Sequence, residues 1–169
     1  MFECRPAEKA LNYLKIQSGE TALEVDFGAG YCLQRIATSV GNCGKVSGID
    51  ISQSMAQRAR ERLNKASLMG RVELCTGDAA KLPFDNETFD VAFISLTLEL
   101  FESPEISEVL GELRRVLKPR GRLGVVSLLK PAADSLPVRV YEWIHAKWTK
   151  YVDCRPIYLD RSVQAAASK

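Results

Sequence analysis

The sequence predicts an α/β domain built on a doubly wound, mostly parallel sheet. Short apolar runs of strand length alternate with amphipathic helical patterns between residues 21 and 129. The run at 89–96 is almost continuously apolar, which is typical of a strand buried on both faces. Strands that alternate with helices form right-handed crossover units, and these units place the strands parallel.

The first four elements follow from local patterns. Apolar residues at helical spacing predict a helix over 6–16, and a Ser-Gly turn ends it. A strand is predicted over 21–27. Four apolar residues then recur at i, i+3, i+4 and i+7 over 33–40, which indicates a helix that Gly41 closes. A second short strand is predicted over 45–51.

The remaining elements repeat this alternation. Ser52 is a candidate N-cap for a helix that ends near residue 70, and a third strand is predicted over 71–76. After the strand at 89–96, a Ser-Pro-Glu start and an apolar stripe predict a helix over 103–117. A Lys-Pro-Arg-Gly turn should break that helix before a fifth strand over 122–129. The alternation then stops.

Composition narrows the class of protein. A chain of 169 residues suits one domain, and a net charge of +2 is too weak to indicate nucleic-acid binding. The five cysteines form no CxxC pair and there is one histidine, so neither structural disulfides nor a metal site is expected. No apolar segment is long enough to cross a bilayer, and no signal pattern begins the chain. We expect a cytoplasmic protein.

A glycine turn after the first strand indicates a ligand site. Gly28 and Gly30 let a ligand lie against bare backbone, and the next helix offers unpaired N–H groups. Asp50 ends the second strand, where an acid usually binds two ribose hydroxyls. A dinucleotide or an adenosyl cofactor would use this arrangement. A dinucleotide fingerprint requires a third glycine at position 33, which is Leu33 here, so a nicotinamide oxidoreductase remains only a distant alternative.

Four ordered motifs carry a family resemblance. ALEVDFGAGY, VSGIDIS, GDAAKLPFDNETFDVAF and LRRVLKPRGRL resemble the class I S-adenosylmethionine-dependent methyltransferases, and in particular the ubiquinone and menaquinone biosynthesis group. The resemblance covers residues 19–129. It implies strand order 3-2-1-4-5, and a Rossmann-like domain over 1–129 that binds S-adenosylmethionine. Residues 130–169 would be an aromatic helical segment, either an acceptor-side cap or the start of a truncated region.

The resemblance also implies a set of binding residues. Glu24 matches the acid of the first motif, and the backbone of 27–30 would face the methionine part of the cofactor. Asp50 would hold the ribose hydroxyls, Asp78 would bind the adenine amino group, and Ser95 would lie on the sulfonium side. The complete set is Glu24, Asp26, Phe27, Gly28, Gly30, Asp50, Ile51, Gly77, Asp78, Ala79 and Ser95.

The chain departs from the family pattern at three places. Asp26 stands where the family has the first glycine of its G-x-G-x-G motif. In an alternative register, Asp26 is the motif acid and Cys32 replaces the third glycine, but the spacing to Asp50 favours the first register. Arg120 replaces a glycine of the later turn, and the family's last two strands are not evident. Asp26 either reaches the sulfonium or amino group, or it marks a weakened site.

The expected reaction is in-line methyl transfer to a small-molecule acceptor, which depends mostly on positioning. Candidate bases are Tyr31, Glu99, Tyr141 and His145, although no catalytic residue is evident. The alternative function is an S-adenosylmethionine-binding module without turnover that stabilises a partner. An uncovered edge at the fifth strand would favour a homodimer or another partner there.

Overall fold

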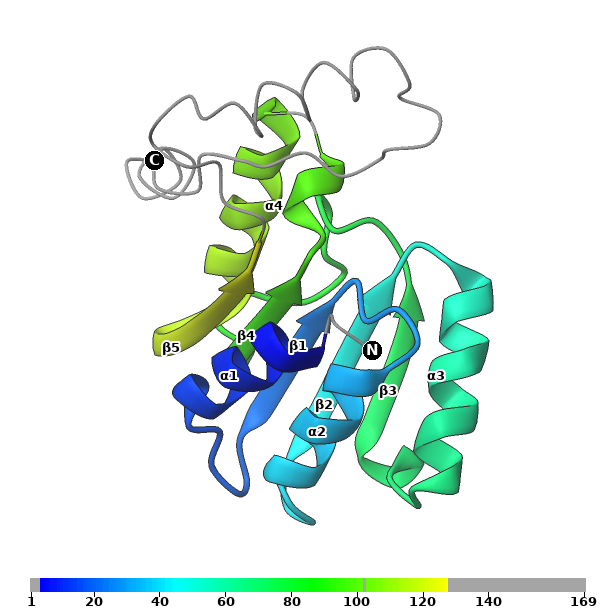
Figure 1. Cartoon of the computed structure of the whole chain (residues 1–169). Coiled ribbons are helices and arrows are strands. Elements are labelled where there is room, and N and C mark those ends of the chain that lie inside the picture. The colour runs from blue at the N-terminus through cyan, green and yellow to red at the C-terminus, as the bar shows by residue number, and fades with distance from the viewer. Residues whose placement is uncertain (1–3, 102, 128–169) are drawn as a thin grey trace.

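The computed structural model describes residues 4–101 and 103–127. In this part of the chain, five strands form one parallel sheet in the order β3-β2-β1-β4-β5 (Figure 1). The strands are β1 (Thr21–Val25), β2 (Lys45–Asp50), β3 (Val72–Thr76), β4 (Phe89–Ser95) and β5 (Leu117–Val126). The predicted fold class and strand order are confirmed.

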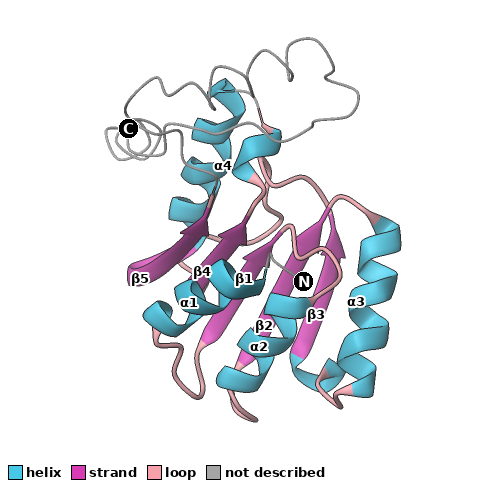
Figure 2. Cartoon of the chain, viewed as in Figure 1, coloured by secondary structure: helices cyan, strands magenta, loops and turns pink. Residues whose placement is uncertain are grey.

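Helices cover both faces of the sheet (Figure 2). The helices are α1 (Cys4–Leu14), α2 (Tyr31–Ser39), α3 (Gln53–Lys65) and α4 (Ser103–Val116), with short 3-10 turns η1 (Met69–Arg71) and η2 (Leu98–Leu100). Buried side chains of α1, α2 and α3 share one apolar cluster, and those of α4 share another. The sheet therefore separates two cores, in a three-layer arrangement.

The central strand β1 shows how the sequence divides between these cores. Successive side chains of a strand point to opposite faces. Ala22 packs in the cluster of α1, α2 and α3, whereas Leu23 and Val25 pack in the cluster of α4. Glu24 has the parity of Ala22, and it is only 3% exposed. A carboxyl group is thus buried on the face covered by α1, α2 and α3.

The helix ends are set by the caps that the sequence indicates. The Ser52 hydroxyl accepts a hydrogen bond from the Met55 amide at 3.3 Å, which confirms Ser52 as the N-cap of α3. Gly41 follows α2 with a φ of 67°, a backbone conformation that glycine adopts without strain. Helix α3 ends at Lys65, earlier than predicted, because Ser67 has a φ of 56° and the η1 turn follows.

Strand β5 differs from the prediction at its start. It begins at Leu117 and includes the Lys-Pro-Arg-Gly segment that we expected to be a free turn. The pairing with β4 shifts register there, since Phe89 pairs with Leu117 but Val91 pairs with Arg122. Pro119 has no amide to donate to a ladder, and Arg120 has a φ of 68°. The segment therefore bulges out of the strand instead of preceding it.

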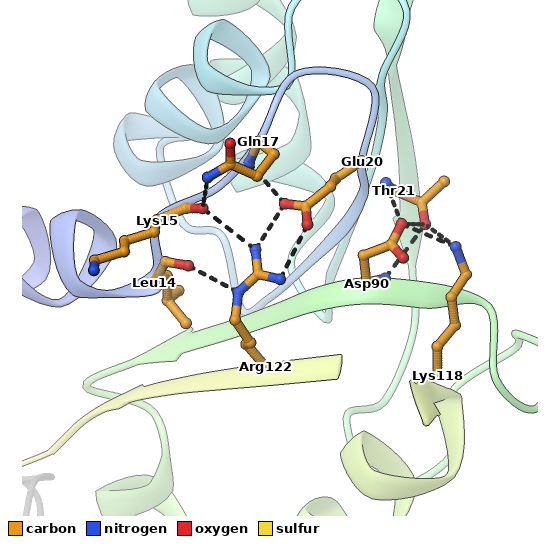
Figure 3. A network of polar contacts seen from close by, with 8 residues as sticks. All are labelled: Leu14, Lys15, Gln17, Glu20, Thr21, Asp90, Lys118 and Arg122. Atoms are coloured by element: carbon orange, nitrogen blue, oxygen red, sulfur yellow. Dashed lines mark hydrogen bonds and ion pairs between the residues drawn. The ribbon is translucent and has the colours of Figure 1, made fainter. Parts of the chain in front are cut away.

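Asp90 joins three strands at the amino-terminal edge of the sheet (Figure 3). Its Oδ2 accepts hydrogen bonds from the Thr21 amide at 2.9 Å and the Thr21 hydroxyl at 2.8 Å, and it pairs with Lys118 Nζ at 2.9 Å. Burial alone would raise the pKa of Asp90, but the Thr21 amide and the Lys118 ammonium lower it to about 2. The carboxylate thus stabilises the edge as an anion.

Arg122 makes a second contact at the same edge (Figure 3). Its guanidinium binds both carboxylate oxygens of Glu20, at 2.7 and 3.0 Å, and donates to the Leu14 carbonyl at 2.8 Å. The Leu14 carbonyl belongs to the last turn of α1, where helical carbonyls lack partners. Arg122 therefore fixes the end of α1 to β5.

The predicted aromatic segment over 130–169, with Tyr141 and His145, lies outside the described residues. The end of the predicted fifth strand at 127–129 extends past the described part of β5. Within the described ranges, none of the helices combines the length and the apolar character that crossing a bilayer requires.

Candidate functional site

The carboxyl ends of β1 and β2 converge on the glycine turn. Three residues of this turn have positive φ angles: Asp26 at 58°, Gly28 at 51° and Gly30 at 78°. A positive φ is uncommon for a residue with a side chain, although aspartate tolerates it better than most. Asp26 therefore takes a glycine-like conformation while it adds a carboxylate.

Asp50 fixes the shape of the turn. The carboxylate is 3% exposed, and its Oδ2 accepts the Gly28 amide while its Oδ1 accepts the Ser52 amide, both at 2.8 Å. These bonds connect the end of β2 to the glycine turn and to the start of α3. A carboxylate oxygen accepts more than one hydrogen bond. Asp50 thus supports the backbone and retains acceptor capacity for a ligand.

A first cavity, which we call the Asp50 cavity, has a volume of about 200 Å³. Its walls are largely apolar, and Ile51 and Leu100 in them are 76% and 50% exposed. Exposed aliphatic side chains in a concave wall suit a flat apolar ring. The lining residues are Val25, Asp26, Ile49, Asp50, Ile51, Gly77, Asp78, Ala79, Thr97, Leu100 and Phe101.

A second cavity, the Glu24 cavity, has a volume of about 300 Å³ and shares Asp26 with the Asp50 cavity. One wall comes from α1 through Ala7. Glu24 Oε2 is buried in the described structure and has no hydrogen-bond partner there. The lining residues are Ala7, Glu24, Asp26, Phe27, Gly28, Ala29, Tyr31, Cys32, Ser95 and Leu96.

Four carboxyl groups, those of Glu24, Asp26, Asp50 and Asp78, line the two cavities. Burial raises the pKa of Glu24 well above 4.5, and the charges of Asp26 and Asp50 raise it further. Burial also raises the pKa of Asp26, and the charge of the neighbouring Asp50 raises it further. The Thr97 hydroxyl, which donates to Asp26 Oδ2 at 2.9 Å, lowers the pKa of Asp26 in part. Among the described residues that line either cavity there is no lysine, arginine or histidine. The arrangement favours a cationic ligand.

The structure brings together ten of the eleven residues predicted to bind a cofactor, because each of them lines one of the two cavities. Gly30 does not line either. A Cβ at Gly30 would lie 2.9 Å from Ala59 Cβ, so this glycine allows the glycine turn to pack against α3. Gly28 has no such neighbour within 4 Å and faces open space.

Of the four candidate bases, the structure describes the side chain of Tyr31 alone. Tyr31 is 57% exposed, lines the Glu24 cavity, and lies under the Arg62 guanidinium, which is 3.4 Å from the ring centroid. Glu99 belongs to η2, but its side chain lies outside the described structure, as do Tyr141 and His145.

Sequence reasoning missed Thr97, which is 2% exposed and orients Asp26. The sequence around Thr97 is mostly apolar and does not indicate this contact with Asp26, because only the fold brings the two residues together.

Comparisons with known proteins agree with this geometry. Residues 22–121 match the sequence profile of the family described as "Methyltransferase domain". The chain is 33% identical over 124 residues to a demethylmenaquinone methyltransferase of Lactobacillus johnsonii, covering 73% of this chain and 50% of that protein. It is 36% identical over 121 residues to the ubiquinone/menaquinone biosynthesis C-methyltransferase UbiE of Escherichia fergusonii, covering 72% of this chain and 47% of that protein. The chain thus spans about half the length of these curated relatives.

Solved structures show the same fold. A SAM-dependent methyltransferase from Aquifex aeolicus superposes with a TM-score of 0.65 at 30% identity, covering 83% of this chain and 77% of the other. A structure from Bacillus halodurans, titled a putative methyltransferase, superposes with a TM-score of 0.80 over 95% of this chain and 67% of the other. At 23% identity, the second similarity concerns the fold alone.

Proposed function

The chain belongs to the class I S-adenosylmethionine-dependent methyltransferases, and we propose that it transfers a methyl group from S-adenosylmethionine to a small-molecule acceptor. S-adenosylmethionine is the cofactor of this family. The observation that carries the proposal is the pair of cavities at the carboxyl ends of β1 and β2. In these cavities, Glu24 and Asp50 have unused carboxylate acceptors. We further propose residues 1–129 as the cofactor-binding unit, since the described residues that line the two cavities lie between Ala7 and Phe101.

The residues present fit this cofactor. In the proposed arrangement, Asp50 accepts the ribose hydroxyls with the lone pairs that the two backbone amides leave free. Ile51 and Ala79 offer apolar contact to the adenine, and Asp78 accepts its amino group. Glu24 Oε2, which lacks a partner in the described structure, accepts the methionine ammonium. Gly28 leaves space for the methionine chain, since nothing lies within 4 Å of its missing Cβ.

Bound S-adenosylmethionine supplies an electrophilic methyl group on a sulfonium. The residues of this chain would contribute position: the glycine turn and Asp50 would hold the cofactor, and the Glu24 cavity would admit the acceptor. Methyl transfer in line with the breaking bond depends mainly on such alignment. Ser95 and Leu96, at the end of β4, line the cavity where the acceptor would approach.

The names of the relatives favour a quinone-type acceptor that is methylated on carbon. Such an acceptor loses a proton from the ring carbon after the methyl group is attached, so a base must take up that proton. Tyr31 is the candidate base whose side chain the structure places on the cavity wall.

Calorimetric titration of the intact protein with S-adenosylmethionine and S-adenosylhomocysteine tests the binding proposal. We expect both ligands to bind, and Asp50→Ala to weaken each by about ten- to a hundredfold, because charged hydrogen bonds are lost. Absence of binding by the wild-type protein would refute the proposal. Transfer of a labelled methyl group to a demethylated quinol then tests turnover. Binding without transfer to any quinol acceptor would favour the alternative function, a cofactor-binding module.

A further inference from the structure

Of the residues that the structure describes, Asp26 is the one that lines both the Asp50 cavity and the Glu24 cavity. A ligand that occupies both cavities must therefore pass its carboxylate. The Thr97 hydroxyl donates a hydrogen bond to Asp26 Oδ2 at 2.9 Å, and the Asp50 carboxyl group lies close enough for its charge to act on Asp26. The side chain is thus fixed at the junction, and its backbone takes the φ of 58° that a glycine would take more easily.

The proposed function determines which part of the ligand meets this junction. With adenosine in the Asp50 cavity and the amino acid in the Glu24 cavity, the sulfur atom joins the two halves. That sulfur is positively charged in S-adenosylmethionine and neutral in S-adenosylhomocysteine, the product of methyl transfer. The ammonium group is present in both molecules. A carboxylate at the junction would therefore sense the difference between cofactor and product.

On the basis of the proposed function, we propose that Asp26 is a specificity residue whose carboxylate attracts the sulfonium and so makes the site prefer S-adenosylmethionine over S-adenosylhomocysteine. In the part of the chain that the structure describes, neither cavity wall offers Asp26 a lysine, arginine or histidine as a counter-ion. A further carboxyl group, that of Asp50, lies close enough to destabilise its charged form. A cationic ligand relieves that repulsion, and a neutral thioether does not. The consequence for the enzyme is weaker inhibition by its own product.

Two substitutions at Asp26 test this role. Asp26→Asn keeps the size of the side chain and an oxygen for the Thr97 hydroxyl, but it removes the charge. Asp26→Gly suits the positive φ better than aspartate does, so it keeps the proposal testable if the amide variant folds poorly. The matched control is Asp85→Asn, an exposed aspartate in the loop before β4, at the opposite edge of the sheet from the site.

Calorimetry would measure the dissociation constants of the two ligands for each protein near neutral pH. We expect either Asp26 variant to weaken S-adenosylmethionine binding about tenfold and S-adenosylhomocysteine binding less than about threefold, with the control unchanged. Equal weakening of both ligands would mean that Asp26 serves the ammonium or only the fold, and would overturn the proposal, as would unchanged binding of both. Failure of the wild-type protein to bind either ligand would instead overturn the proposed function itself.

Discussion

The two glycines of the turn have different roles, and an alanine substitution at each should distinguish the two roles. Gly28 and Gly30 both have positive φ angles, so either alanine strains the backbone. At Gly28 the new methyl group meets nothing within 4 Å, and Gly28 is part of the wall of the Glu24 cavity. At Gly30 it meets Ala59 Cβ at 2.9 Å and Ala59 Cα at 3.0 Å. We expect Gly28→Ala to impair binding and Gly30→Ala to impair folding.

The magnitudes follow from these contacts. Left-handed backbone costs a residue with a Cβ about 1–2 kcal/mol, and the stiffer unfolded chain offsets about 0.4–1 kcal/mol of that. Gly28→Ala should therefore lower the free energy of unfolding by about 1 kcal/mol. Gly30→Ala adds an overpacked contact against α3, which costs about 1–3 kcal/mol more, since Ala59 Cα is backbone and cannot rotate away. Its total should be about 2–4 kcal/mol.

Urea denaturation followed by circular dichroism measures both losses, and calorimetry with S-adenosylhomocysteine measures binding. Ala59→Gly is the matched partner substitution: it costs about 1 kcal/mol by itself in a helix, but it should recover part of the Gly30→Ala loss. Equal destabilisation by the two alanines would refute the reasoning. So would full additivity of Gly30→Ala with Ala59→Gly, because no contact would then connect the two positions.

Three further predictions concern charged groups. Asp90→Asn should lower the free energy of unfolding by about 1 kcal/mol at neutral pH, allowing for an Asp90 side chain that is 30% exposed. Because the folded pKa of Asp90 is about 2 against 3.8, that contribution should fade in urea melts as the pH falls from 4 towards 2. Burial raises the pKa of Glu24 in the folded state, so Glu24→Gln should become more stable relative to wild type in thermal melts as the pH rises above 4.5. A difference in melting temperature that does not change with pH would contradict this. Arg122→Met should cost about 1–2 kcal/mol by freeing the Leu14 carbonyl, whereas Arg120→Met, at an exposed position, should leave urea stability nearly unchanged.

Much of the fold could be predicted because the signals are local. The alternation of strand and helix patterns, the Ser52 cap and the Gly41 stop act within a few residues, and the structure confirms each of them. The predicted start of β5 is wrong because the true start depends on pairing with β4. By itself, a segment with a proline and a positive φ has the pattern of a free turn. A bulge of this kind is visible only when the partner strand is in place.

The candidate site was predictable in part for the same reason. Carboxyl ends of parallel strands meet at one edge of a sheet, so residues that follow β1, β2, β3 and β4 had to converge. The role of Gly30 was not predictable, because its contact with Ala59 comes from the packing of the turn against α3. Thr97 was missed for a similar reason, since its hydroxyl meets Asp26 only across the completed site.

Both hydrogen bonds that Asp50 accepts come from backbone amides. Side chains around the site can therefore change without disconnecting Asp50 from the turn, because every residue except proline carries the required N–H group. The Asp50 bonds should therefore tolerate substitutions at other positions that line the two cavities. An aspartate in a glycine position, as at Asp26, is one such change that leaves the supporting bonds in place. Protein engineers who wish to alter ligand preference at this turn could vary Asp26 while Asp50 keeps the loop in shape.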